Sequence, residues 1–166
     1  FVKAWCCIFA TFLSLRTLMV ILKKMSKTII VVYGRANEGK TSTLRLFYEL
    51  LGGNLKNKNS DIYEPIIFLE KLIGFISESD PGDETLKKFI KRVIELIEKK
   101  CEYLILTSRT KGKVVKFIDK IANEHDYNVV WTSTTFSPNL NHNLINQIDS
   151  EHLKKILIEL ITNEKI

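Results

Sequence analysis

The strongest constraint on the fold is a glycine-rich loop that joins two segments of different periodicity. Residues 28–33 (TIIVVY) form an unbroken, β-branched apolar run, which is typical of a strand buried on both faces of a sheet. Residues 40–51 repeat apolar side chains at helical spacing and stop at Gly52-Gly53, which favours a helix with a glycine exit. Residues 34–41 (GRANEGKT) lie between them and match the spacing G-x-x-x-x-G-K-[ST]. The sequence therefore predicts a tight turn from a buried strand into a helix.

The residue types in this turn suit the binding of a phosphate group. Glycines allow successive backbone N–H groups to point at one anion, and the following helix presents its positive N-terminal end to the same place. Lys40 can reach the outer phosphates of a nucleotide, while the Thr41 hydroxyl can ligate Mg²⁺. The expected phosphate-binding residues are Gly34, Arg35, Ala36, Asn37, Glu38, Gly39, Lys40, Thr41 and Ser42.

On these residues the chain resembles the P-loop NTPase superfamily. The likeness is most specific over residues 28–51, and the alternation of strand and helix patterns over residues 25–166 is similar as well. The chain also looks like small, uncharacterised bacterial P-loop proteins, in which a strand ending in Ser and Asp and a later Thr-Arg-Thr-like turn follow the loop. The resemblance implies a nucleoside triphosphate ligand, with ATP expected first, and Mg²⁺ as the cofactor.

Strand and helix patterns alternate through the rest of the chain. Residues 66–69 and 72–77 are strand candidates that could form a hairpin or one long bent strand. Further strands are expected at 103–107 and 128–133, and the helix after Pro81-Gly82 is expected to bury Leu86, Phe89, Ile90, Val93, Ile94 and Ile97. Two more helices are expected, one with an apolar face at Val114, Val115, Ile118, Ile121 and Ala122, the other at 150–162. Residues 137–147 are Asn-rich and are expected to be irregular, as in a lid.

This alternation predicts the fold class. Right-handed crossovers between successive strands produce a parallel sheet that is covered by helices on both faces. We expect a three-layer α/β domain with a mostly parallel sheet over residues 25–166, similar to the P-loop NTPase fold.

An acidic residue is expected to complete the metal site. P-loop proteins commonly carry one at the end of a neighbouring strand, where it holds Mg²⁺ through water. Asp80, which ends LIGFISESD, is the candidate, and Glu78 or Asp83 could serve instead. The alternative is that Asp80 and Asp83 begin a helix, where acidic residues are stabilising.

Two arginines and a tryptophan are placed near the same edge. Arg109 follows the YLILT strand and could pair with a phosphate, although a solvated cation at a helix start is the alternative. Arg35 is expected over the nucleotide, whereas Glu38 is expected to face solvent. Trp131 is assigned to the core rather than to stacking on a base. The expected catalytic residues are Lys40, Asp80 and Arg109, with Thr41 and Asp80 as metal ligands.

Charge and cysteine content narrow the partners. The chain has 166 residues and a net charge of +6, but residues 1–24 hold four of its 25 basic residues and none of its 19 acidic ones. Residues 25–166 therefore carry a net charge of only +2, which is no strong signal of nucleic-acid binding. The three cysteines show no disulfide or metal spacing, so a cytoplasmic location is expected.

Residues 1–24 are apolar and basic, and three explanations stay open. They could be an amphipathic anchor, a weak membrane helix interrupted by Arg16, or sequence upstream of a natural start at Met25. We favour the third, because the strand and helix pattern is complete without them. Membrane contact is expected only if this segment is part of the natural protein and inserts.

Three functions fit the motif. The first is hydrolysis of a nucleoside triphosphate by a small Mg²⁺-dependent P-loop NTPase. The second is a nucleoside- or nucleotide-kinase-like phosphotransferase. Such kinases generally have an arginine-rich lid and an acceptor-binding arginine after the second strand. Residues 61–83 and 137–147 contain no arginine, which disfavours this function. The third is a non-catalytic nucleotide-binding module. A GTPase is disfavoured because the Asn-Lys-x-Asp pattern that reads guanine is absent.

Overall fold

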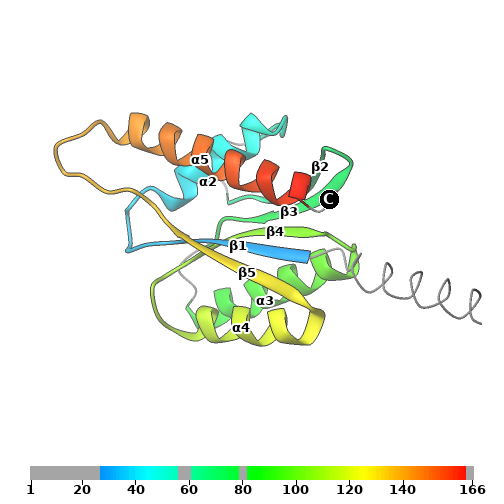
Figure 1. Cartoon of the computed structure of the whole chain (residues 1–166). Helices are drawn as coiled ribbons and strands as arrows, with labels where there is room; N and C mark the ends of the chain where they lie inside the picture. The colour runs from blue at the N-terminus through cyan, green and yellow to red at the C-terminus, as the bar shows by residue number, and fades with distance from the viewer. Residues whose placement is uncertain (1–26, 56–60, 79–81, 164–166) are drawn as a thin grey trace, which may run out of the picture.

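A computed structural model describes residues 27–55, 61–78 and 82–163 of the chain. Within them it contains five strands and four helices, arranged as one layered α/β unit (Figure 1). The strands are β1 (Lys27–Tyr33), β2 (Tyr63–Phe68), β3 (Lys71–Ile76), β4 (Tyr103–Ser108) and β5 (Tyr127–Ser133). The helices are α2 (Lys40–Leu50), α3 (Asp83–Glu98), α4 (Lys113–His125) and α5 (His142–Asn163). The expectations for residues 1–24 lie outside the described residues.

The five strands form a single mixed sheet in the order β2-β3-β4-β1-β5. β1 is an interior strand that pairs in parallel with β4 and β5, β3 pairs in parallel with β4, and β2 is antiparallel to β3. The structure thus selects a hairpin for the β2–β3 region. Its two-residue turn, Leu69-Glu70, has φ values of 48° and 65°, and left-handed backbone at both positions matches the twist of a two-residue hairpin.

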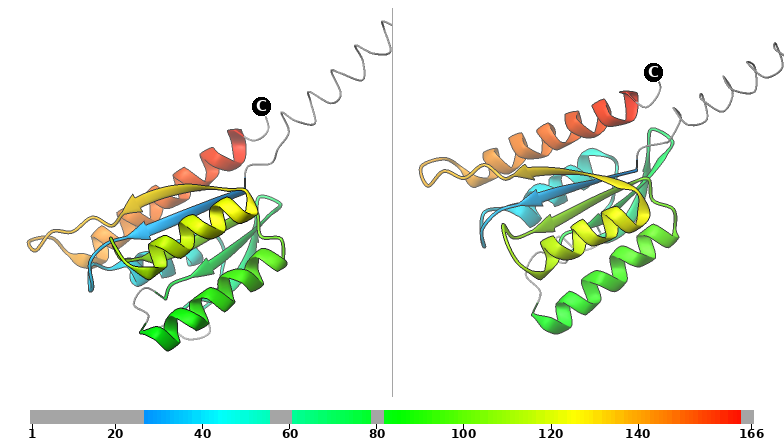
Figure 2. Two further views of the ribbon diagram at one scale, coloured as in Figure 1. Left: turned by 90° about the horizontal axis from the view of Figure 1, so that it is seen from below. Right: turned by 60° about the horizontal axis from the view of Figure 1, so that its bottom comes forward.

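Helices cover both faces of the sheet, which confirms the predicted layers (Figures 1 and 2). α2 and α5 lie on one face, and α3 and α4 lie on the other. Alternate residues of β1 serve the two cores: Ile29 and Val31 pack on the α3/α4 side, while Ile30 and Val32 pack on the α2/α5 side. This double burial explains the continuous apolar run of β1, because no residue in the middle of the strand meets water.

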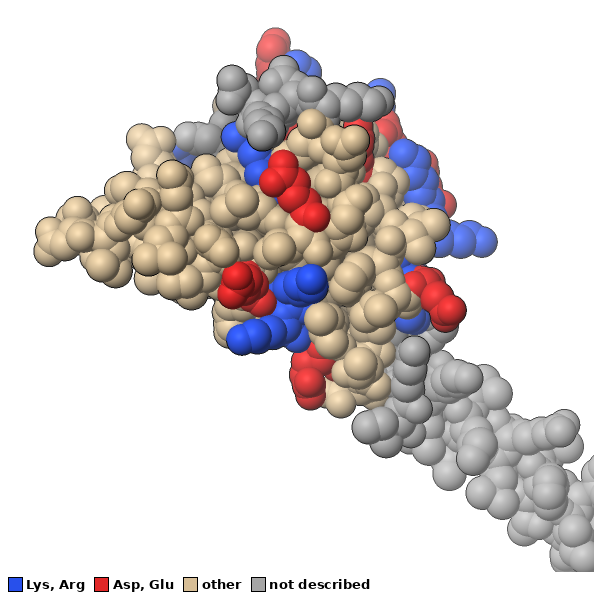
Figure 3. Space-filling view, turned by 90° about the horizontal axis from the view of Figure 1, so that it is seen from above, with Lys and Arg blue, Asp and Glu red and all other residues tan. Residues whose placement is uncertain are grey.

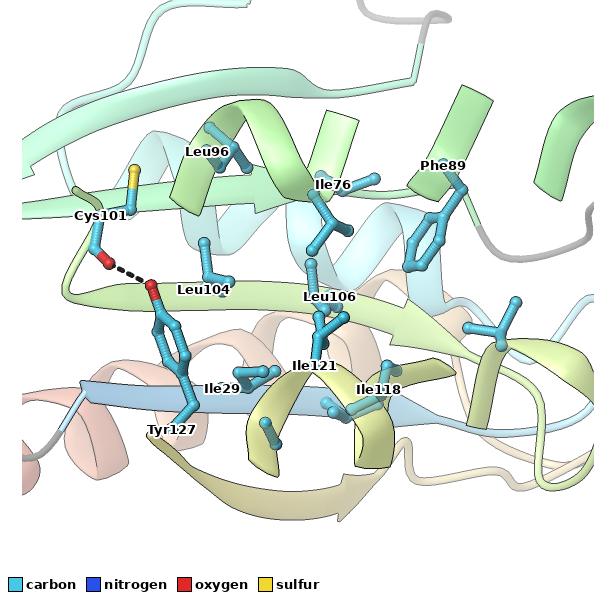
Figure 4. Packing of buried hydrophobic residues seen from close by; sticks show 14 residues of the cluster. Ile29, Ile76, Phe89, Leu96, Cys101, Leu104, Leu106, Ile118, Ile121 and Tyr127 are labelled. Carbon is cyan, nitrogen blue, oxygen red and sulfur yellow. Dashed lines mark hydrogen bonds between the residues drawn. The ribbon is translucent and has the colours of Figure 1, made fainter. Parts of the chain in front are cut away.

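The α3/α4 core ends in a polar contact between the start of β5 and Cys101, two residues before β4. The Tyr127 hydroxyl donates a hydrogen bond to the backbone oxygen of Cys101 at 2.6 Å (Figure 4). Burial raises the pKa of the Cys101 thiol to about 11, and it also raises the pKa of Tyr127. The buried hydroxyl thus shares a hydrogen bond with a buried backbone carbonyl, as groups of both kinds require.

Two sequence predictions about helices are wrong in detail. α5 begins at His142, so residues 142–147 are helical rather than part of an irregular lid. The Asn141 side chain accepts a hydrogen bond from the Asn143 N–H at 2.9 Å and so caps the start of the helix. In an Asn-rich sequence, composition does not distinguish this capping residue from its neighbours. In α3, Ile94 is 40% exposed, whereas Leu96, which the prediction omitted, is fully buried. The buried face of α3 therefore includes Leu96 and leaves Ile94 exposed.

No helix in the described part of the chain is long and apolar enough to cross a membrane.

Candidate phosphate-binding site

The loop of residues 34–39 connects the carboxyl end of β1 to the first residue of α2. Its two sharpest positions are Asn37, with φ 63°, and Gly39, with φ 78°. Left-handed backbone suits glycine and is tolerated by asparagine, so the two residue types match the turn. Gly39 precedes α2 and no side chain caps that helix. The N-terminal backbone amides of α2 therefore lie directly behind the loop.

Lys40 ties the loop together. Its side chain is 4% exposed, and its ammonium group donates hydrogen bonds to the backbone oxygens of Gly34, at 3.1 Å, and Arg35. The lysine at the end of the motif thus reaches back to the first two residues of the motif. Its charge lies among backbone oxygens of the loop and not in the apolar core.

Thr41 links the start of α2 to the end of β3. Its hydroxyl donates to the backbone oxygen of Ser77 at 3.3 Å. The Ser77 hydroxyl in turn donates to a carboxylate oxygen of Asp61 at 3.1 Å and accepts from the Ile62 N–H at 2.8 Å. Asp61 is a site candidate that sequence reasoning missed. It lies in a polar, lysine- and asparagine-rich segment before β2, where no strand or motif pattern marks it.

The expected acidic residues have different outcomes. Asp80 lies outside the described residues, and for Asp83 only the backbone is described, at the start of α3. Glu78 is 11% exposed on its side chain and forms an ion pair with Arg92 of α3, with 3.0 Å between Oε2 and the guanidinium nitrogen. β3 is not next to β1, because β4 lies between them. The end of β3 therefore contacts the start of α2 through the Thr41 hydroxyl and does not pair with β1.

Metal-binding capacity must come from few protein groups. Within the described residues, no group of three or more His, Cys, Asp or Glu side chains could hold a metal ion. Mg²⁺ bound with a nucleotide needs fewer protein ligands, because phosphate oxygens and water supply most of its six positions. The Thr41 hydroxyl and the Asp61 carboxylate both hydrogen-bond to Ser77, and these two groups fit that smaller requirement.

The two arginines lie on the exposed rim of the sheet. Ser108 is in register with Tyr33, so Arg109 and Gly34 follow neighbouring parallel strands at the same level. The Arg35 side chain is exposed at the first turn of the loop. Both placements agree with the expected edge.

Glu38 differs from its prediction. The sequence suggested that it faces solvent, but its side chain is half-buried and its carboxylate accepts the backbone N–H of Arg35. A methyl group at Gly34 would lie 2.9 Å from the same carboxylate and 2.8 Å from the hydroxyl of Thr134. The Glu38 side chain therefore folds back over the loop, because its carboxylate is the acceptor for the Arg35 amide. Glycine at position 34 makes room for both groups.

α5 supports the loop from behind. Thr43 of α2 is within hydrogen-bonding distance of Asn146, with 3.3 Å between Oγ1 and Oδ1, and both residues are buried. Asp149, one turn further along, accepts hydrogen bonds of 2.7 Å from the N–H and the hydroxyl of Thr135. The Thr43–Asn146 contact joins residues 103 positions apart in the chain, so no local pattern could reveal it.

The surface beside the loop lacks charge. Residues 127–148 contain no Lys, Arg, Asp or Glu, and Figure 3 shows a broad uncharged surface that extends along the side of the β5–α5 connection. Four large apolar residues of this region are more than half exposed: Phe136, Leu140, Leu144 and Ile148.

Comparisons of the chain with models of known protein families, with curated proteins and with solved structures find no match.

Proposed function

We propose that this chain binds a nucleoside triphosphate, with ATP as the expected ligand, in the loop of residues 34–42 and hydrolyses it in the presence of Mg²⁺. One observation carries the proposal: the Lys40 ammonium group lies inside the loop, hydrogen-bonded to the backbone oxygens of Gly34 and Arg35. That arrangement holds a cation at the N-terminus of α2, where the helix dipole also favours an anion.

Specific residues would contact the phosphates. The backbone amides of the loop and of the first turn of α2 would bind the phosphate oxygens, and Lys40 would neutralise the outer phosphates. Arg109, level with Gly34 on the next strand, would stabilise charge on the transferred group. Arg35 would lie over the phosphates from the exposed side.

The metal would be held at the junction of α2 and β3. Thr41 would be a direct ligand, and Asp61 or Asp80 would act through bound water. When bound, Mg²⁺ would offset the negative charge that develops on the phosphate oxygens. Asp61 has the stronger structural support, because its carboxylate already contacts Ser77, whose backbone oxygen accepts from Thr41.

Hydrolysis is the simplest reaction for such a site. Water attacks the terminal phosphorus, the bond to the bridging oxygen breaks, and the products are a nucleoside diphosphate and inorganic phosphate. Product analysis separates this reaction from the alternatives. A phosphorylated acceptor would identify a phosphotransferase, and tight binding without turnover would identify a binding module.

A calorimetric titration with ATP and Mg²⁺ tests the binding step. Lys40→Ala is expected to lower ATP affinity by at least about a hundredfold, since a charge-assisted phosphate contact in a partly buried site is strong. Lys113→Ala is the matched control, because Lys113 also follows a glycine and begins a helix at the same edge of the sheet. Equal affinities for the wild type and the Lys40 variant would refute the proposal.

A further inference from the structure

A pocket opens on the opposite face of the sheet from α2, directly beneath the start of the loop. It has a volume of about 300 Å³ and is lined by Tyr33, Thr110, Val115 and Trp131. Trp131 is 38% exposed, so its assignment to the core is wrong. β5 is an edge strand, and its α4-side surface is only partly covered. The volume is at the lower end of the range for small-molecule sites.

Two aromatic rings that meet edge to face form part of the pocket wall. Tyr33 and Trp131 have ring centroids 6.1 Å apart and planes at 69°, an edge-to-face pair. An edge-to-face contact favours this mutual orientation of the two rings. The half-exposed tryptophan therefore presents an oriented aromatic surface to the pocket.

The pocket and the loop share the same end of the sheet. Tyr33 is bonded directly to Gly34, the first residue of the loop, so their Cα atoms are about 3.8 Å apart. Thr110 lies two residues beyond the end of β4, and Thr134, after β5, donates its N–H to the Tyr33 oxygen at 3.2 Å. A ligand whose phosphates lie in the loop can thus cross the end of β1 and reach the pocket.

We propose that this pocket holds the base of the nucleoside triphosphate, with Trp131 as the stacking surface and Tyr33 as the wall nearest the loop. The inference rests on the proposed function, which supplies the phosphates. A flat ring is the occupant that matches an oriented aromatic surface of this size, because every nucleobase has a face that can stack on an aromatic side chain.

The lining also sets the selectivity. Of the described residues, Tyr33, Thr110 and Trp131 bring side-chain polar groups to the pocket, and none that lines it has a carboxylate or amide side chain. Recognition of one base over another requires such groups at defined positions on the base edge. The pocket therefore selects by stacking area, and purine nucleotides are preferred to pyrimidine nucleotides with little difference between ATP and GTP.

The test compares ATP with inorganic tripolyphosphate, which has the phosphates but no base. Binding of both is measured by calorimetry with Mg²⁺ for the full chain and for Trp131→Leu and Trp131→Phe. Trp131→Leu should weaken ATP binding at least about fivefold and leave tripolyphosphate binding within about twofold. Trp131→Phe should restore most of the ATP affinity, since the aromatic face is kept.

Each outcome decides between the two proposals. Wild-type protein that binds tripolyphosphate as tightly as ATP would overturn the base pocket while leaving the phosphate site intact. Equal loss of both ligands in Trp131→Leu would show that Trp131 only supports the loop. No binding of either ligand to the wild type would refute both proposals, and a preference of more than about a hundredfold for ATP over GTP would refute selection by stacking.

Discussion

Asn146, on α5, lies against Gly39 so closely that a methyl group at Gly39 would come within 2.3 Å of the Asn146 side-chain oxygen. The second glycine of the motif is therefore required twice, once by its left-handed backbone and once by its neighbour. The loop is packed from behind by a helix that begins more than a hundred residues later in the chain.

Gly39→Ala should be more destabilising than an alanine at another left-handed glycine. We expect a loss of about 2–4 kcal/mol in the free energy of unfolding, from left-handed strain and the clash with Asn146. Gly52→Ala is the control, because Gly52 has φ 92° but no atom within 4 Å of the added methyl group, so about 1–2 kcal/mol is expected. Urea unfolding measures both, and equal losses would show that Asn146 does not crowd the loop.

Asn146→Ala should partly rescue Gly39→Ala. Alone, Asn146→Ala is expected to cost about 1 kcal/mol through the lost contact with Thr43. In the double variant the crowded oxygen is gone, so the combined loss should be smaller than the sum of the single losses by at least about 0.5 kcal/mol. A double-mutant cycle by urea unfolding gives this coupling, and strict additivity would contradict it.

Glu38→Gln should strengthen the binding of ATP. The Glu38 carboxylate accepts the Arg35 N–H, a donor suited to a phosphate oxygen, and its charge opposes an incoming phosphate. Removal of that charge is worth roughly 1 kcal/mol, or about a fivefold gain in affinity. Glu49→Gln, an exposed residue in the last turn of α2, is the control and should change ATP affinity little. Weaker binding by Glu38→Gln would instead assign the carboxylate a supporting role in the loop.

Arg92→Met should cost more stability than removal of a surface ion pair. The substitution leaves the buried Glu78 carboxylate without its guanidinium partner, and we expect a loss of about 1.5–3 kcal/mol in the free energy of unfolding. Lys120→Met removes an exposed pair with Glu124, separated by 3.8 Å, and should cost at most about 0.5 kcal/mol. If thermal or urea unfolding gives similar values for the two variants, the Glu78–Arg92 pair is not structural.

Stability should fall at alkaline pH because of Cys101. Its pKa is raised by burial from 9.0 to about 11, so the folded chain keeps a proton that the unfolded chain releases. The contribution of the protonated thiol to the free energy of unfolding is complete below pH 9 and is lost between about pH 9 and 11. Over that range the free energy of unfolding falls by up to about 1.4 kcal/mol per pH unit. Cys101→Ala should flatten the urea-unfolding profile between pH 9 and 10. Identical slopes for both proteins would exclude this effect.

The sequence determined the parts of this protein that depend on local interactions. The β-branched run of β1, the glycine-lysine turn and the periodic faces of α2 and α4 predicted the three-layer fold and placed the loop, since each signal is contained within a few residues. The position of Arg109 at the same edge also followed, because parallel strands end together.

Only the tertiary structure decided which distant groups surround the loop. Local patterns do not encode the contact of Asp61 with Ser77 or that of Asn146 with Thr43, which depend on how the hairpin and α5 pack. Burial of Trp131 was wrongly predicted for the same reason: an aromatic residue in a strand has the same pattern in the centre of a sheet and at its edge. Strand order, which is set by long-range pairing, makes that difference.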